Sequence, residues 1–420
     1  MRKPRILVTG ASGRNASAAV LDLLKRGFPV RAFVRREDKR SQALRATGAE
    51  IFVGDLFDYR DLERAMVDVQ RAYHSAPYAP NLLHGVTLFA IAAEQAKLEV
   101  VAWMSQWNPH PVHPSAFTRE HWIANQIVRW MPSVAAIHVN PGLFAYVYFL
   151  GLPAIVHFGM FTAPFGEGLN APPSNEDIGR VAAAILANPE GRIGNTFRPT
   201  GPTLISPHDA AAAMGKALGR AVRYVPNSLK QFTKAATATG VSPFDLASMR
   251  HYVQELAGGT YAVGAPTDHV EMLTGRPAED IETIARRYIN HPELIAPGIR
   301  AGTKLGAFLF LARMMFTRVP SFDRWEREHL LPSLNRPLLA HENSAWRAHA
   351  QTQRLYLLDE SVAAGESIGQ TPSDSGERKQ PGALHPEAEK IHSLLSVVRP
   401  GSQMMVTDKL PSAGSSRAQE

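Results

Sequence analysis

Short apolar runs alternate with amphipathic segments over the first third of the chain. Continuous apolar runs bounded by turn residues are typical of strands that are buried on both faces, and the segments between them place apolar residues at helical spacing. Strands that alternate with helices predict an α/β fold with a doubly wound parallel sheet, which binds ligands at the carboxyl ends of its strands. The predicted strands are residues 5–9, 30–34, 51–53, 71–75, 100–104 and 135–139. The first predicted helix ends at residue 26, and the next ones cover about residues 39–47, 62–67, 82–96 and 119–131.

The next segment, residues 130–166, contains no Asp, Glu, Lys or Arg. Prolines and glycines interrupt this segment, so a helix through it would leave backbone groups unsatisfied in a bilayer. We therefore expect it to form core and the wall of an apolar pocket. Residues 194–225 predict a strand, a helix that begins at Ser206 and a second strand, and a small lobe of helices follows to about Asn290.

These patterns divide the chain into a main unit, an extension and a tail. The main unit is residues 1–290, in which residues 1–150 form the core of strands and helices and residues 151–290 add the completing strands and a small C-terminal lobe. Residues 291–360 are expected to form a helical extension. Residues 361–420 are rich in Ser, Gly, Pro and charges of both signs, a composition that predicts a disordered tail.

The extension contains an apolar stretch at residues 305–316. This stretch is too short to span a bilayer, so we expect a helix that is buried or lies at an interface. A helix on a membrane surface is the alternative, but membrane contact is not the expectation.

Composition and charge exclude several classes of function. The chain has 420 residues, of which 45% are hydrophobic and 20% charged, as in soluble globular proteins. Its net charge of +7 is diffuse, and no run of Lys and Arg carries interleaved aromatics, so nucleic acid is not an expected ligand. The absence of cysteine excludes disulfides and thiolate chemistry. A first strand so close to the N-terminus leaves no room for a signal peptide, and a cytoplasmic location is expected.

The most specific motif joins the first strand to the first helix and reads TGASGRNA at residues 9–16. Gly10 allows a tight turn, and Gly13 lets the backbone approach a pyrophosphate at the N-terminus of the following helix. Ala16 keeps helix and strand close, and the spacing GxxGxxA indicates the short-chain dehydrogenase version of the dinucleotide motif. The predicted cofactor contacts in this turn are Thr9, Gly10, Ser12, Gly13, Arg14 and Asn15.

Positive charge where the second strand ends indicates which dinucleotide is bound. An acid at this place binds the adenosine ribose of NAD, whereas arginine pairs with the 2′-phosphate of NADP. Arg35 and Arg36 follow the strand here, and Arg14 projects near the same ribose. NADP(H) is therefore predicted, with NAD less favoured, and the alternative is that Arg35 and Arg36 are solvated loop charges. Asp55, after the third strand, is placed either to accept from the adenine amino group or to cap a helix.

The chain resembles the NmrA-like atypical short-chain dehydrogenases/reductases in the motifs TGASGRNA, VRAFVRR and GDLFD and in residues 75–77 and 140–142. The resemblance covers residues 1–290, and it extends to residues 176–179 and 273–278, which look like the family's cofactor-domain helix and the segment before its last helix. It implies a Rossmann domain with a small C-terminal substrate lobe and NADP binding. Members of the family divide into reductases of quinone-like or carbonyl compounds and non-catalytic redox sensors. The contacts that it implies after the fourth strand are Ser75, Ala76 and Pro77.

The usual catalytic pair of short-chain reductases is missing. That pair is a proton-donating tyrosine and a lysine one helical turn later, but none of the 10 tyrosines has a lysine at this spacing, and no lysine lies between Leu98 and Gly215. In its place we predict that Ser105 binds a substrate carbonyl and that His121 supplies a proton. Arg119 is predicted to hold ribose or substrate charge. The alternatives are structural: a loop-capping Ser105, a His121 on a helix face and a solvated Arg119.

His110 and His113 form an HxxH pattern that suggests a metal site. Prolines punctuate this pattern, and no ligating acid lies near it in the sequence. We therefore predict no metal site and expect structural loop histidines.

Two functions fit these observations. The first is an NADPH-dependent reductase that transfers hydride to a small apolar substrate, quinone-like or carbonyl, without a Tyr-Lys pair. The second is a non-catalytic NADP(H)-sensing protein that regulates or binds a protein partner. The missing pair favours the sensor, whereas the uncharged aromatic segment favours the reductase, to which the sequence leans. The predicted substrate wall is Trp107, Phe144, Tyr146 and Tyr148.

Overall fold

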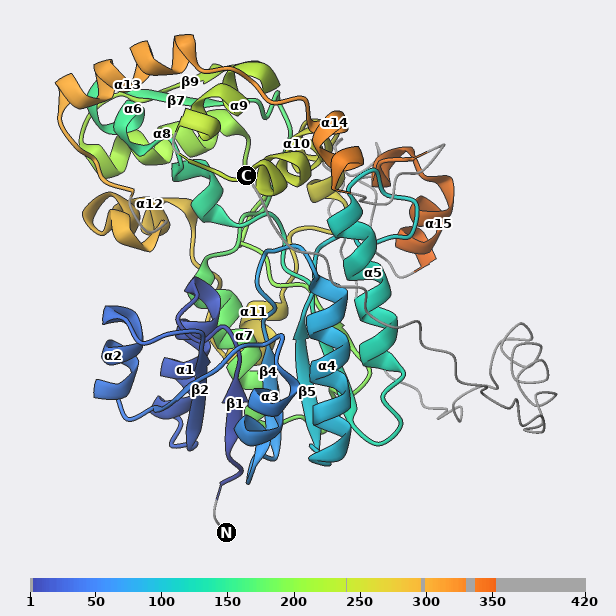
Figure 1. Cartoon of the computed structure of the whole chain (residues 1–420). Coiled ribbons are helices and arrows are strands. Elements are labelled where there is room, and N and C mark those ends of the chain that lie inside the picture. The colour runs from blue at the N-terminus through green and yellow to red at the C-terminus, as the bar shows by residue number, and fades with distance from the viewer. Residues whose placement is uncertain (1–2, 239, 296–298, 330–336, 353–420) are drawn as a thin grey trace, which may run out of the picture. The chain divides into compact units, whose positions relative to one another are not determined.

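Seven parallel strands form the central sheet of the protein (Figure 1). They are β1 (Ile6–Val8), β2 (Val30–Val34), β3 (Glu50–Val53), β4 (Arg71–His74), β5 (Val100–Met104), β6 (Ala135–Val139) and β8 (Thr196–Phe197). Their order, β3-β2-β1-β4-β5-β6-β8, reverses between β1 and β4, which is where a doubly wound sheet binds its ligand. The predicted α/β doubly wound parallel sheet is confirmed. This computed structural model describes residues 3–238, 240–295, 299–329 and 337–352.

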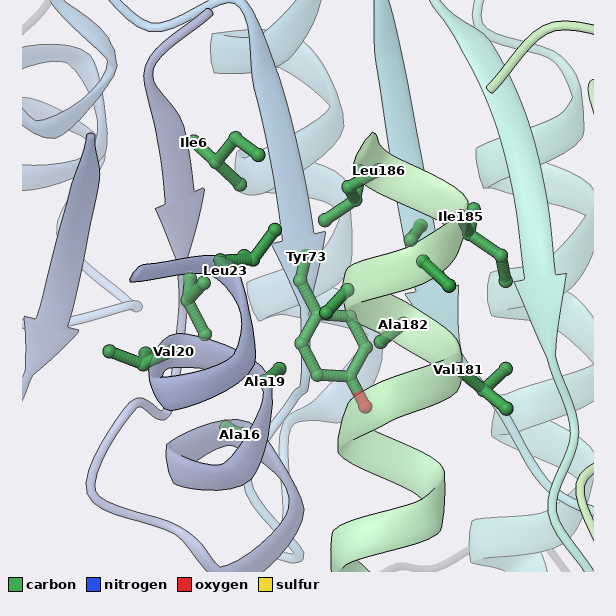
Figure 2. Packing of buried hydrophobic residues seen from close by; sticks show 14 of the residues in the cluster. Ile6, Ala16, Ala19, Val20, Leu23, Tyr73, Val181, Ala182, Ile185 and Leu186 are labelled. Carbon is green, nitrogen blue, oxygen red and sulfur yellow. The ribbon is translucent and has the colours of Figure 1, made fainter. Parts of the chain in front are cut away.

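Helices cover both faces of the sheet and create two separate cores. They are α1 (Arg14–Lys25), α2 (Lys39–Ala46), α3 (Tyr59–Met66), α4 (Leu82–Gln95), α5 (Ala116–Arg129) and α7 (Asn175–Ala187). Ile6 and Val8 of β1 pack on the side of α1 and α7, whereas Leu7 packs on the side of α3, α4 and α5. Figure 2 shows small residues of α1, such as Ala16 and Ala19, facing apolar residues of α7.

A second lobe is built from segments that leave the sheet and return to it. Its elements are α6 (Leu152–Phe158), β7 (Met160–Ala163), α8 (Pro207–Leu218), β9 (Arg223–Pro226), α9 (Leu229–Ala238), α10 (Pro243–Ala257) and α12 (Ile281–Asn290). Strands β7 and β9 pair in parallel, and α12 packs against α8. Between these lobe segments, α11 (His269–Thr274) returns to pack against α7. The uncharged segment predicted to form core contributes Tyr148, Phe149 and Phe161 to the core of this lobe.

The extension adds three further helices in the described residues, α13 (Lys304–Phe316), α14 (Phe322–Glu328) and α15 (Ser344–Thr352). α13 packs against α6 and α9, but Ala307 is its buried residue, so the expectation of a buried helix is wrong for the outer face of α13. No helix in the described part of the chain is long and apolar enough to cross a membrane. The predicted disorder of residues 361–420 lies outside the described residues.

Predicted and observed boundaries agree at both ends for three strands of the sheet. β2, β5 and β6 have the predicted bounds at both ends. α5 begins earlier than predicted because the Ser115 side chain accepts a hydrogen bond from the Thr118 N–H and caps the helix. α3 also begins earlier, because the Asp58 side chain accepts from the Arg60 N–H.

Candidate functional site

The turn between β1 and α1 is too tight for a side chain at either glycine. Gly10 has a φ of +59°, and a Cβ there would lie 2.8 Å from the carbonyl oxygen of Ser75. A Cβ on Gly13 would lie 2.9 Å from the carbonyl oxygen of Gly10. α1 begins after Gly13 with no side-chain cap and no acid in its first turn. Because the first N–H groups of a helix have no intrahelical acceptor, this turn presents backbone donors and the positive end of the helix dipole to an anion.

The end of β4 is joined to this turn by hydrogen bonds. The buried Thr9 hydroxyl accepts from the Ser75 N–H at 3.0 Å and lies 2.9 Å from Nδ1 of His74. The Ser75 hydroxyl donates to Oδ1 of Asn15 at 3.4 Å. Thr9 is thus a positioning residue that holds the two loops together, whereas Ser75 and Asn15 lie at the point where the strand order reverses. Of the other predicted contacts here, Ser12 and Ala76 are half-buried and Pro77 is exposed.

Arginines lie around the glycine turn. The Nε of Arg14 is buried without a hydrogen-bond partner among the described residues, and Arg35 is exposed just after β2. Arg40, which no sequence motif indicated, donates from Nη1 to the Ser12 carbonyl oxygen at 3.3 Å and pairs with Asp38. Asp38 is the N-cap of α2, so the local capping geometry brings Arg40 back to the glycine turn.

Asp55 follows β3 and is exposed. Its Oδ1 accepts a hydrogen bond from the Phe57 N–H at 2.9 Å, and the helix-capping alternative is wrong because Asp58 caps α3. The predicted contact of Asp55 with adenine stays a prediction.

Unpaired polar atoms gather where β5 and β6 end. Ser105 directly follows β5 and is 4% exposed, and its hydroxyl has no hydrogen-bond partner within the described ranges. Gln106 donates from Nε2 to the Tyr252 hydroxyl at 2.9 Å, but its Oε1 is likewise unpaired. Asn140 directly follows β6, and its Oδ1 is unpaired too. Since buried polar atoms are rarely left unpaired, these atoms are candidates to bind a polar ligand group at the carboxyl edge.

His121 is buried on α5, one helical turn after Phe117. Its Nδ1 lies 3.0 Å from the Phe117 carbonyl oxygen, so Nδ1 carries the proton of the neutral ring and Nε2 has a free lone pair. The ring packs edge-on against Phe117 and stacks near Trp103. Burial lowers the pKa of His121 to about 4. The ring is therefore neutral at pH 7, which disfavours the predicted role as a proton donor.

Arg119 is directed at the loop that precedes α5. Its Nη1 donates to the carbonyl oxygens of His113 at 2.6 Å and Pro114 at 3.0 Å. Burial lowers the pKa of Arg119 below its ordinary value. These bonds make Arg119 a positioning residue for the loop and argue against the predicted contact with a ribose or a substrate.

The predicted aromatic wall divides into two parts. Phe144 and Tyr146 are half-buried with ring centroids 5.8 Å apart, and the Arg14 guanidinium lies 4.1 Å from the centre of the Tyr146 ring. This pair therefore adjoins the glycine turn. Trp107 and Tyr148 are buried in the core of the second lobe, and their role as wall residues stays a prediction.

His110 and His113 meet Glu255 of α10 in a buried cluster whose potential ligand atoms lie within 4.8 Å of one another. No acid lies near these histidines in the sequence, but the fold brings Glu255 to them. However, Nδ1 of His113 accepts from the Ser115 N–H at 2.9 Å, so the proton of the neutral ring is on Nε2, 3.1 Å from Oε1 of Glu255. Asn108 also donates to this oxygen at 2.5 Å. Nε2 of His113, both ring nitrogens of His110 and Oε2 of Glu255 have no hydrogen-bond partner among the described residues, and the absence of a metal site stays a prediction.

These features define the class of the protein: an α/β protein with a dinucleotide-type glycine turn where the order of its parallel strands reverses. Residues 2–259 match the NmrA-like family. The chain belongs to this family, as the resemblance of its motifs predicted.

Known relatives include enzymes and a regulator. The chain is 31% identical over 284 residues to the NAD(P)H azoreductase of Xenophilus azovorans, a match that covers 67% of this chain and 97% of that protein. The solved structure of an NADPH-dependent quinone oxidoreductase from Escherichia coli, complexed with NADPH, has a TM-score of 0.59 and 22% identity and covers 68% of this chain and 100% of its own. NmrA, a negative transcriptional regulator in complex with NADP, has a TM-score of 0.56 and 19% identity and covers 72% of this chain and 99% of its own. At these identities the two structures support the fold alone.

Proposed function

We propose that this protein is an NADPH-dependent reductase of an apolar, conjugated acceptor such as a quinone or an aromatic carbonyl compound. The names of its relatives, an NAD(P)H azoreductase and a quinone oxidoreductase, support this class of reaction. The half-buried rings of Phe144 and Tyr146 beside the glycine turn support an aromatic acceptor.

The observation that carries the proposal is the glycine turn with the uncapped N-terminus of α1. The close contacts at Gly10 and Gly13 leave only backbone facing the site, which suits a pyrophosphate. Arg14, Arg35 and Arg40 supply the positive charge that a 2′-phosphate requires, which supports NADP(H) over NAD(H). When bound, the nicotinamide supplies the hydride.

The chain's own part in the reaction is to orient the acceptor and to stabilise the charge that it gains. The unpaired hydroxyl of Ser105 would donate a hydrogen bond to the acceptor oxygen, where negative charge develops as hydride arrives. Gln106 is held by Tyr252 beside it, and burial raises the pKa of Tyr252, which keeps that hydroxyl protonated. A conjugated acceptor delocalises its new charge and can take the final proton from water, so a strong acid is not required.

The test is titration with NADPH, followed by NADPH oxidation with a panel of quinones and aromatic carbonyl compounds. We expect the Gly13→Asp variant to raise the Kd for NADPH by about a hundredfold or more, because the carboxylate would occupy the pyrophosphate position. Gly151→Asp is the matched control, since Gly151 has a φ of −90° and no atom lies within 4 Å of its added Cβ. Ser105→Ala should lower turnover about tenfold or more and leave the Kd unchanged.

The sensor is the second candidate, because the Tyr-Lys pair is missing and the His121 ring is neutral at pH 7. It predicts tight NADPH binding with no oxidation of the cofactor by any acceptor in the panel. That result would overturn the reductase, and absence of NADPH binding would overturn both candidates.

A further inference from the structure

The outer face of α13 exposes a concentration of large apolar side chains. Leu305, Phe308, Leu309, Met315 and Phe316 are 67%, 61%, 58%, 67% and 83% exposed, respectively. The opposite side of α13 packs against α6 and α9, so these side chains cannot turn inward without detaching the helix. Exposed apolar patches on folded proteins mark interaction surfaces. We call these five side chains the α13 face.

Positive charge surrounds the α13 face. Arg300, Lys304, Arg313 and Arg318 are exposed, and none of them forms a salt bridge with a described residue. The sequence has no acidic residue at positions 294–322, and α6 and α9, on which α13 packs, also contain none. An apolar face surrounded by uncompensated cations is complementary to a partner with an apolar interior beneath a layer of negative charge.

We propose that α13 docks this protein onto the surface of an anionic lipid bilayer, with the α13 face inserted at the level of the headgroups. Its 13 residues span about 20 Å, which suits a helix lying in the plane of the membrane. The cations at its ends and flanks would meet the phosphates of anionic lipids. A second copy of the chain fits less well, because a symmetric dimer through α13 would place these cations against one another. The inference does not depend on the proposed reductase activity.

The test is sedimentation of the full chain with vesicles of phosphatidylcholine, alone or mixed with phosphatidylglycerol. We expect binding to the anionic vesicles that weakens as salt is raised. The Phe308→Ser/Phe316→Ser double variant should reduce the partition coefficient by about tenfold or more, because it removes apolar area that would be buried in the bilayer. Trp130→Ser is the matched control, because Trp130 is 75% exposed but lies at the end of α5. It should bind as the unaltered chain does.

A second variant tests the charge directly, and light scattering tests self-association. Arg313→Gln/Arg318→Gln should weaken binding to anionic vesicles at low salt without changing the melting temperature. No binding to anionic vesicles, or unchanged binding by both double variants, would overturn the proposal. So would a dimer in solution that Phe308→Ser/Phe316→Ser converts to a monomer, because α13 would then be an interface between copies of the chain.

Discussion

Arg40 at the start of α2 and Arg60 at the start of α3 make the same local contact. Each lies two residues after the aspartate that caps its helix, and each pairs with that aspartate, Asp38 or Asp58. Arg40 alone of the two donates to the carbonyl oxygen of Ser12 in the glycine turn. The same motif therefore serves only to cap α3 but brings a positive charge to the candidate site at α2.

This difference predicts a role for Arg40 in the choice of cofactor. Arg40→Gln should raise the Kd for NADPH about tenfold while leaving the Kd for NADH almost unchanged, because hydrogen bonds to charged groups are worth about 1.5–3 kcal/mol. Arg60→Gln, the matched control, should change neither value. Titration of the three proteins with both cofactors measures the effect, and an equal loss for NADPH and NADH would contradict it.

At the scale of elements, α7 packs against α1, the helix that follows the glycine turn (Figure 2). A Cβ on Gly179 would lie 2.6 Å from the Asn15 carbonyl oxygen and 2.6 Å from the Ala19 N atom. These are backbone atoms of α1, which cannot yield as a flexible side chain would. Gly179 therefore lets α7 pack closely against the first turn of α1, on the same face of the sheet.

Gly179→Ala should destabilise the protein by about 1–3 kcal/mol, because it overpacks this contact. It should also raise the Kd for NADPH, since α1 must shift away from α7 and takes Asn15 with it. Thermal unfolding and NADPH titration measure the two effects. Gly151→Ala is the control, because an added Cβ meets nothing within 4 Å there and should leave both values unchanged. A destabilised Gly179→Ala variant with an unchanged Kd for NADPH would show that the packing of α7 on α1 does not affect cofactor binding.

The sequence predicted strands better than it predicted exposure. β2 and β5 are almost wholly buried, and their observed bounds agree with the predicted ones. The apolar run of α13 has the same composition as a core helix, and nothing in the run itself shows that its outer face lacks a covering element. Exposure depends on tertiary packing, which is not a local property of the sequence.

The site was predictable where local geometry decides it. Gly10 and Gly13 lie in the turn between β1 and α1, and Ser105 directly follows β5, so local sequence places all three. The partners of the same loops were not predictable, because Glu255 reaches Asn108 across 147 residues and Tyr252 reaches Gln106 across 146. The direction of Arg119 was missed for a related reason: the carbonyl groups that it binds belong to a loop with no periodic pattern.

At the scale of the whole molecule, buried histidines connect stability to pH. Burial lowers the pKa from 6.5 to about 4 or 3 at histidines 74, 110, 121, 138 and 251. The unfolded chain therefore binds more protons than the folded chain once the pH falls below about 6.5. The free energy of unfolding should decrease as the pH is lowered from about 6.5 toward 4.

His138 offers a direct test, because both its ring nitrogens are buried without hydrogen-bond partners among the described residues. His138→Leu should make the melting temperature fall less steeply between pH 6.5 and pH 4, since one group that must be protonated on unfolding is gone. His208→Gln, at an exposed ring, should leave the slope unchanged. A slope that is the same in all three proteins would show that His138 is not part of this dependence.

The chain passes several times between the central sheet and the second lobe. It leaves the central sheet after β6, returns for α7 and β8, leaves again for α8 to α10, returns with α11 and leaves once more for α12. Neither the central sheet with its helices nor the second lobe is a contiguous stretch of the chain, so the second lobe cannot be exchanged between relatives as one segment. During synthesis, the sheet gains β8 only after α6 and β7 have emerged. The central sheet is therefore complete only after part of the second lobe has been synthesised.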